Sequence, residues 1–140
     1  MTGPVLLDTG PLVAIISLRD PCHAVCNTQL QHLRPPLLTT WAVLTKAMWM
    51  LRRYPQAIRR MHHCVRIGMF TLPVLDETAL VWMLGFCQRY ADCSPQLADA
   101  SLVYLAERER IDTVFTLDRR DFSIYRIGKH RCFRLLPKHL

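Results

Sequence analysis

Residues 5–16, VLLDTGPLVAII, carry one charge, on Asp8, which is followed by a turn at Gly10. The apolar run before the acid predicts a short buried strand over 5–7, and the spacing after the turn predicts a helix over 12–18. An acid at the carboxyl end of a buried strand lies where open α/β sheets bind their ligands. The stretch therefore predicts both an α/β fold and a functional edge.

The rest of the chain continues to alternate extended and helical patterns. Strands are predicted over 37–38, 69–72, 113–117 and 132–135. Helices are predicted from Pro21 to before Pro35, over 41–53 capped by Thr39 or Thr40, from Pro55 as first helical residue to Gly68, over 77–90 capped by Asp76, and after Ser94 and Pro95. This alternation predicts a mainly parallel sheet, and the length of 140 residues predicts one domain over 1–140.

Positive charge is concentrated in one segment of the chain. Residues 21–75 contain seven Arg or Lys residues and no Asp or Glu, whereas the remaining residues carry eleven charges of each sign. A segment of one sign is typical of a surface that faces a polyanion, most often a nucleic acid. A solvated basic face is the simpler alternative.

The six cysteines are scattered through apolar segments. No charged leader with a small-residue cleavage site precedes them, which predicts free thiols in a reducing, cytoplasmic compartment. No apolar run reaches the length of a membrane span, so no membrane association is expected. The groups Cys22, His23, Cys26 and His62, His63, Cys64 invite a zinc interpretation, but their spacing fits no common structural zinc site well.

Two more acids stand in positions that need an explanation. Asp118, in VFTLDRRDF, follows a predicted strand as Asp8 does, and Asp99 faces along the apolar side of a predicted helix. A carboxylate on such a face needs a partner. Three acids in one crevice would repel one another unless a cation lay between them, and Mg²⁺ or Mn²⁺ suits oxygen ligands. Alternatively, Asp8 and Asp118 cap turns, and Asp99 pairs with an arginine.

Four segments together resemble the PIN domains, particularly the ribonuclease toxins of the VapC type. These segments are LLDTGPLVA, the predicted helix from Thr40 to Leu51, LADASLVYLAE, and VFTLDRRDFSIYR, in family order and spacing. The resemblance covers nearly the whole chain. It implies a three-layer α/β/α sandwich, a catalytic cluster of Asp8, Asp99 and Asp118 that holds Mg²⁺ or Mn²⁺, and hydrolysis of RNA. It also implies homodimers and a small antitoxin partner that covers the crevice.

Other residues are assigned supporting roles. Thr116 is expected to hydrogen-bond an acid or a bound water. Asp121 is expected either to lie next to the metal-binding acids without binding the metal itself, or to cap a helix. The exposed arginines Arg52, Arg53, Arg119 and Arg120 are candidates for RNA phosphate contacts. Trp41, Trp49 and Trp82 are expected to pack in the core or to form a dimer face.

The chain departs from the family pattern at two positions. Lys46 stands where the resemblance implies a glutamate of the acid cluster, and Gln96 stands where many such toxins carry a further acid. The apolar neighbours of Lys46 predict that its side chain points inward. The resulting hypothesis is that metal affinity and hydrolysis are weakened or lost.

Two alternatives to a nuclease remain open. The same fold could bind RNA or an antitoxin without cutting, through the basic residues between Arg34 and Arg66. A phosphotransferase with Asp8 as nucleophile would need a second aspartate two residues later, where the chain has Gly10.

Overall fold

The computed structural model describes residues 3–140, which form a parallel sheet covered by helices. The strands are β1 (Leu6–Leu7), β2 (Leu37–Leu38), β3 (Phe70–Thr71), β4 (Thr113–Phe115), β5 (Arg126–Ile127), β6 (Arg131–Cys132) and β7 (Arg134–Leu136). The helices are α1 (Thr9–Ile16), α2 (His23–Gln31), α3 (Trp41–Met50), α4 (Ala57–Arg66), α5 (Glu77–Arg89), α6 (Leu97–Glu109) and α7 (Arg119–Ile124), with a short 3₁₀ turn η1 (Ala91–Cys93).

Five strands form the main sheet in the order β3-β2-β1-β4-β7, and all neighbouring pairs are parallel. Leu6 of β1 pairs with Leu38 on one side and with Val114 on the other. The chain therefore first builds outward from β1 through β2 and β3, and then returns to the other side of β1 with β4. This reversal creates a topological switch point between β1 and β4, where open α/β sheets bind ligands.

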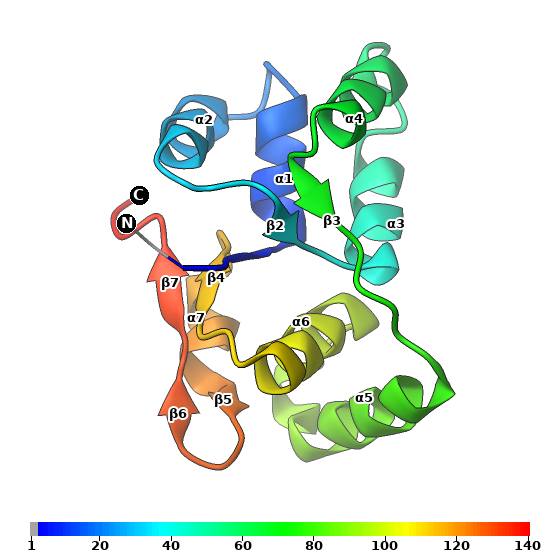
Figure 1. The fold of residues 1–140 in the computed structure, drawn as a ribbon, viewed down its shortest axis with the longest axis vertical. Helices are drawn as coiled ribbons and strands as arrows, with labels where there is room; N and C mark the ends of the chain where they lie inside the picture. The colour runs from blue at the N-terminus through cyan, green and yellow to red at the C-terminus, as the bar shows by residue number, and fades with distance from the viewer. Residues whose placement is uncertain (1–2) are drawn as a thin grey trace.

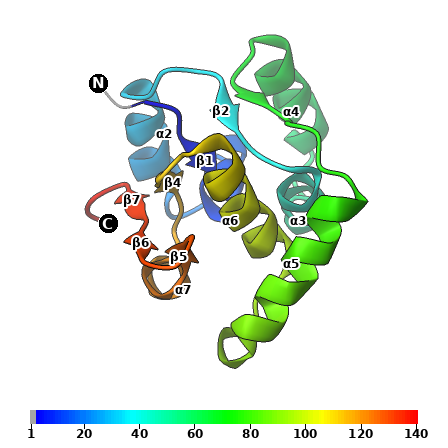
Figure 2. The same cartoon turned by 60° about the horizontal axis from the view of Figure 1, so that its bottom comes forward.

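The molecule has three layers, as the family resemblance implied. In Figure 1, α1, α2 and α4 lie towards the top of the view, α5 and α6 lie at the bottom, and the strands of the sheet lie between them. Figure 2 shows α5 running along α6 on the outside of the molecule. The strands are short and buried on both faces, which explains why Val5, Leu6 and Leu7 form a continuous apolar run.

Several predicted helix boundaries are confirmed by the backbone. Thr40 caps α3 by accepting a hydrogen bond from the amide of Val43, and Asp76 caps α5 through the amide of Ala79. Gly68 follows the end of α4 with φ of +72°, a conformation that favours glycine.

Two predicted helix starts are wrong. Pro55 is not the first helical residue of α4, because a turn from Tyr54 to Ala57 comes first and Gln56 occupies the cap position. The last long helix does not open at Ser94 and Pro95, since Ser94 is left-handed (φ 49°) and Gln96 is still extended. α6 therefore begins at Leu97.

The end of the chain is more structured than the sequence predicted. The expected single strand over 132–135 is divided: Arg131–Cys132 belongs to an antiparallel hairpin with β5, whereas Arg134–Leu136 joins the main sheet beside β4. The helix α7, which the sequence analysis did not predict, follows β4 and carries acids that matter below. Within residues 3–140, every helix is too short or too polar to cross a membrane.

Candidate functional site

A pocket of about 280 Å³ lies at the switch point between β1 and β4. We call it the acid pocket. It contains three of the predicted site acids together with Lys46, and its lining consists of Asp8, Thr9, Gly10, Lys46, Met50, Asp99, Leu117 and Asp118. These residues come from β1–α1, α3, α6 and the loop after β4, so four distant segments of sequence meet there.

Asp8 is held in place by the start of α1. It is the N-cap residue, and its Oδ1 accepts a hydrogen bond from the amide of Thr9 at 2.7 Å. Its own amide donates to the carbonyl of Phe115 on β4 at 3.0 Å. The capping role and the position in the pocket therefore coexist. Burial raises the pKa of Asp8, while the hydroxyl of Thr116, the amide of Thr9 and the charge of Lys46 oppose that rise.

Gly10 serves close packing rather than a special backbone conformation. The sequence analysis assigned it a turn below Asp8, but the residue lies inside α1. A Cβ atom at this position would come within 3.2 Å of the Cβ of Leu117. The absent side chain thus lets the loop after β4 approach the first turn of α1, which brings Leu117 and Asp118 to the pocket.

Thr116 joins two of the acids. Its hydroxyl, fully buried, donates to Oδ2 of Asp8 at 2.7 Å and accepts from the amide of Asp118 at 2.9 Å. With the Thr9 amide on the other oxygen, both oxygens of Asp8 are engaged inside the protein. The position of Asp8 is therefore fixed relative to the loop that carries Asp118.

Asp99 projects from the first turn of α6 and is nearly buried. The phenol of Tyr125 donates to its Oδ2 at 2.9 Å. Burial, and next the repulsion of Asp8, raise the pKa of Asp99 to about 6, against the opposing effects of Tyr125 and Lys46. A cation bound beside Asp99 would stabilise the ionised form of this carboxyl group, which burial and the charge of Asp8 disfavour.

The closest group of acids includes one residue from outside the predicted ligand set. One carboxylate oxygen each of Asp99, Asp118 and Asp121 lies within 4.8 Å of the other two, and within the described part of the chain this is the one such group of three His, Cys, Asp or Glu side chains. Asp118 caps α7 by accepting from the amide of Asp121 at 3.0 Å. Burial and the neighbouring Asp118 raise the pKa of Asp121. The Cys and His groups considered for zinc form no such cluster in these residues.

Lys46 reaches the acid pocket from α3. Its neighbours on the helix, Val43 and Ala47, are buried, so this side of α3 faces the interior. The ammonium group lies near enough to Asp8 and Asp99 to lower the pKa of each carboxyl against the larger effect of burial. The pocket therefore holds a positive charge at the side from which the family resemblance implies a glutamate.

The remaining predicted residues lie outside the pocket. Gln96 is the exposed cap residue of α6 and makes no capping hydrogen bond through its side chain. Arg119 donates to the carbonyls of Pro137 and Lys138, so its guanidinium is bound to the end of the chain. Arg52, Arg53 and Arg120 are exposed and form no ion pair with the described residues.

Thr9 contributes an unusual buried hydroxyl. Thr9 lines the acid pocket, but its Oγ1 has no hydrogen-bond partner. Among the buried side-chain nitrogen and oxygen atoms of residues 3–140, this is the one without a partner. A buried polar atom without a partner costs free energy, about 1–3 kcal/mol. We therefore expect the hydroxyl of Thr9 to destabilise the protein, although the backbone amide of the same residue helps to fix Asp8.

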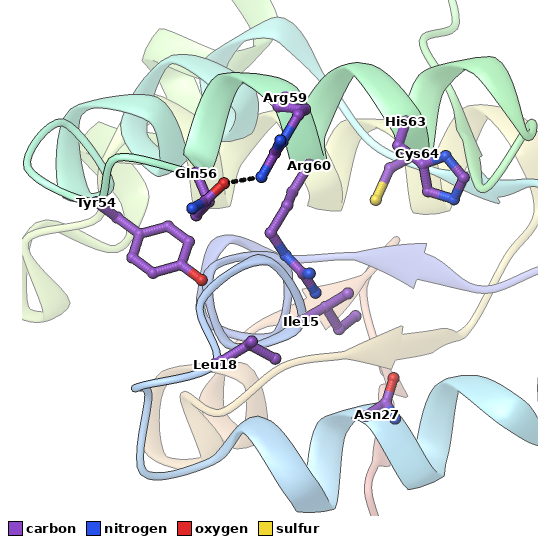
Figure 3. Close-up of a pocket in the computed structure, with 9 residues that line it drawn as sticks. All are labelled: Ile15, Leu18, Asn27, Tyr54, Gln56, Arg59, Arg60, His63 and Cys64. Carbon is purple, nitrogen blue, oxygen red and sulfur yellow. Dashed lines mark hydrogen bonds between the residues drawn. The ribbon is translucent and has the colours of Figure 1, made fainter.

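A larger pocket, of about 720 Å³, lies away from the acids, between α1, α2 and α4. Figure 3 shows Arg59, Arg60 and His63 of α4 on one side, and Ile15 and Leu18 on the side of α1. Arg60 is anchored by a 2.7 Å hydrogen bond from its Nε to the carbonyl of Ile16. No acid lines this pocket, which combines a cationic wall with an apolar floor. We call it the α4 pocket.

Sequence reasoning missed Tyr125 as a neighbour of the acids. The signal was weak, since a tyrosine seven residues after Asp118, directly after a helix that was not predicted, has no characteristic spacing. Figure 1 shows α7 and the hairpin β5–β6 grouped beside the end of β4. Tyr125 lies between α7 and β5, and β5 packs against α6, which carries Asp99. Asp121 was predicted only as a supporting acid, although its oxygen lies in the closest group.

Comparisons with known proteins agree with this architecture. No family model matches the chain. The curated relative ribonuclease VapC26 of Mycobacterium tuberculosis is 29% identical over 148 residues, which cover 95% of this chain and 100% of the relative.

Two solved structures share the fold. The crystal structure of Mycobacterium tuberculosis VapC20, described as a sarcin-ricin loop cleaving toxin, has a TM-score of 0.69 and 13% identity, covering 79% of this chain and 86% of that one. A toxin–antitoxin complex from Klebsiella pneumoniae has a TM-score of 0.65 and 18% identity, covering 86% and 91%. In sequence the chain is therefore similar to a VapC ribonuclease, and in fold it is similar to a VapC toxin and to a toxin–antitoxin complex.

Proposed function

We propose that the acid pocket is the centre of a metal-dependent endoribonuclease whose activity is weakened by Lys46. The observation that carries this proposal is the group of Asp99, Asp118 and Asp121, with oxygens within 4.8 Å of one another, in contact with the pocket that also holds Asp8. Carboxylates at this spacing suit a hard divalent cation such as Mg²⁺ or Mn²⁺. The relationship to a curated ribonuclease supports RNA as the substrate class.

In this proposal the acids divide into two roles. Asp99 and Asp118 face the cation directly, since each belongs both to the close group and to the pocket lining. Asp8, with both oxygens already hydrogen-bonded, orients the loop through Thr116 and adds negative charge. A bound cation would make a water molecule more acidic and stabilise charge on the phosphate. Asp99, Asp118 and Asp121 would hold that cation through their carboxylate oxygens.

Among the residues that line the pocket, Lys46 is the one whose charge opposes a cation. Its ammonium repels a divalent ion that approaches Asp8 or Asp99, and it already neutralises part of their charge. The consequence is lower metal affinity than a pocket lined only by acids would have. The second candidate function follows from the same observation: a protein that binds RNA or an antitoxin with little or no cleavage.

The deciding experiment compares three forms of the chain. Mn²⁺ is titrated by calorimetry into the unmodified protein, Lys46→Glu and Lys46→Met, and each form is then incubated with a mixed RNA pool. The methionine variant is the matched control, because it removes the charge without adding a ligand. We expect metal affinity to rise from the lysine form to the methionine form to the glutamate form, and cleavage to follow it.

Other results would change the proposal. Strong Mn²⁺ binding and cleavage by the unmodified chain would show that Lys46 does not weaken the site. RNA binding without cleavage in all three forms would favour the second candidate function. Failure of all three forms to bind Mn²⁺ would remove the metal centre from the proposal.

The resemblance implies an antitoxin that covers the acid crevice, and we propose a second contact for it, in which the α4 pocket receives an acidic segment with apolar side chains. Arg59, Arg60 and His63 offer positive charge or hydrogen bonds, while Ile15 and Leu18 offer apolar contact. The structural similarity to a toxin–antitoxin complex supports a partner of this kind. A peptide with alternating acidic and apolar residues should bind the chain, and Arg60→Gln should weaken that binding more than Arg110→Gln, which lies elsewhere.

For self-association, we propose that a second copy covers the outer side of α5. Leu80, Val81 and Leu84 are exposed there, which is unusual for three large apolar side chains on two helical turns. Sedimentation should show a dimer that Val81→Glu converts to a monomer. A monomer at all concentrations would contradict this part of the proposal.

A further inference from the structure

Trp49 is a large aromatic side chain that the fold leaves in solvent. The sequence analysis expected it in the core or a dimer face, but 65% of its surface is exposed. Core packing is therefore wrong for this residue, because the exposed side of α3 carries it. Arg52 is not part of the helix but lies in the turn that follows it.

The guanidinium of Arg52 lies over this indole, with its central carbon 3.9 Å from the ring centroid. The same guanidinium donates through Nη1 to the carbonyl of Trp49 at 2.9 Å, so the cation is anchored to the residue whose ring it covers. Such an arrangement combines a flat aromatic surface with a fixed planar cation. Both are surfaces on which nucleic-acid bases stack.

The location of Trp49 connects it to the acid pocket. Lys46, three residues earlier, and Met50, the next residue, both line that pocket. Residues three apart are neighbours on a helix surface, so Trp49 lies next to Lys46 on α3 without itself lining the pocket. A single strand with one phosphate in the pocket would pass Trp49 with a neighbouring base.

The charge around Trp49 favours an anionic partner. Arg52 and Arg53 are exposed and have no ion-pair partner in residues 3–140, and the acid-free segment 21–75 surrounds them in sequence. Trp41, at the other end of α3, is equally exposed at 69%, but it lines a groove with Asp76 and Glu77. The two tryptophans therefore share a helix and differ in the sign of the nearby charge.

We propose that Trp49 and Arg52 form a stacking platform for a base of single-stranded RNA that enters the acid pocket. This inference rests on the proposed function, because it names how the substrate of that site is held. The platform acts on any base through its flat face, and sequence preference would come from other contacts. Stacking needs no metal, so binding can be measured without cleavage.

The experiment uses the full chain with EDTA and a short single-stranded oligoribonucleotide of mixed sequence. Tryptophan emission and RNA affinity are recorded together. We expect RNA to quench the emission of the unmodified protein, Trp49→Phe to lose most of that quenching, and Trp49→Ala to bind RNA about tenfold more weakly. Trp41→Ala is the matched control and should leave affinity unchanged, with thermal unfolding measured for every variant.

Each outcome separates the platform from the proposed function. RNA binding that is equally strong in Trp49→Ala and the unmodified chain overturns the platform but leaves an RNA-binding site elsewhere. Loss of a dimer in Trp49→Ala, measured by sedimentation, with unchanged RNA affinity assigns the indole to protein contact and also overturns it. If the unmodified chain binds no RNA in EDTA but binds or cleaves it once Mn²⁺ is added, the platform is overturned and the proposed function stands. If it binds no RNA in either condition, both fail.

Discussion

Tyr125 donates its phenolic hydrogen to Oδ2 of Asp99 across 2.9 Å, which ties the end of α7 to the start of α6. The ring is fully buried and packs edge-on against Phe86, Tyr90 and Phe122. Burial, and next the charge of Asp99, hold the pKa of Tyr125 far above its usual value, so the phenol remains a donor. The helix α7 is thus capped at its start by Asp118 and followed at its end by Tyr125, which orients Asp99.

Removal of this one hydroxyl should weaken the metal site. Tyr125→Phe keeps the ring but frees Asp99 to rotate, and we expect Mn²⁺ affinity to fall about tenfold, the scale seen when partners of metal ligands are lost. Tyr90→Phe is the matched control, because its hydroxyl accepts from the amide of Arg126 in the same aromatic group.

Because Lys46 is expected to lower the Mn²⁺ affinity of the unmodified chain, two further measurements test the role of Tyr125. Calorimetry is repeated in the Lys46→Glu background, and a crystal structure of Tyr125→Phe shows whether the Asp99 carboxylate turns. An unmoved carboxylate, or equal losses in Tyr125→Phe and Tyr90→Phe, would contradict the positioning role.

The raised pKa of Asp99 predicts how stability depends on pH. With a folded pKa of about 6 and an unfolded value of 3.8, the folded state binds more protons between these values. Unfolding free energy should therefore fall as pH rises through this window, by about 3 kcal/mol from this group, and Asp8 adds a contribution of the same sign.

Urea unfolding in EDTA at several pH values between 4 and 8 tests the sign. Asp99→Asn cannot titrate, so it should gain stability relative to the unmodified chain as pH rises. A difference between the two proteins that stays constant across the range would show that Asp99 titrates normally.

The unpaired hydroxyl of Thr9 gives a prediction that runs against the usual effect of a core substitution. Thr9→Val should leave stability unchanged or raise it by about 1 kcal/mol, because it removes a buried polar atom that has no partner. Thr116→Val should lower stability by about 1–3 kcal/mol, because Asp8 and the amide of Asp118 each lose a hydrogen bond. Denaturant unfolding of both variants at neutral pH makes the comparison, and a loss in Thr9→Val as large as in Thr116→Val would refute it.

The arginines should differ in their effect on the salt dependence of RNA binding. Arg53→Gln should reduce the slope of log affinity against log salt concentration by about 0.7, the value for one phosphate contact on a single strand. Arg119→Gln should leave the slope unchanged, since its guanidinium already serves two carbonyls, and should lower stability instead. Equal slopes for Arg53→Gln and the unmodified chain would remove Arg53 from the RNA path.

The sequence by itself determined the alternation of elements and the acids at strand ends. The apolar run from Val5 to Leu7 favours a buried strand, Asp76 and Thr40 are efficient caps, and Asp8 and Asp118 follow strands that pair in parallel. These features depend on residues close together in the chain, so local propensity and periodicity reveal them. The departure at Lys46 was also visible in the sequence alone, through the resemblance to the family.

Only the tertiary structure decided which oxygens meet. Asp121 lies with Asp99 and Asp118 because α7 begins directly after Asp118. Tyr125 reaches Asp99 because β5, which follows it directly, packs against α6. Trp49 remains in solvent, although its helix is apolar, because Val43 and Ala47 occupy the side that packs. Such contacts join residues far apart in sequence, and their geometry follows from the packing of whole elements rather than from any local pattern.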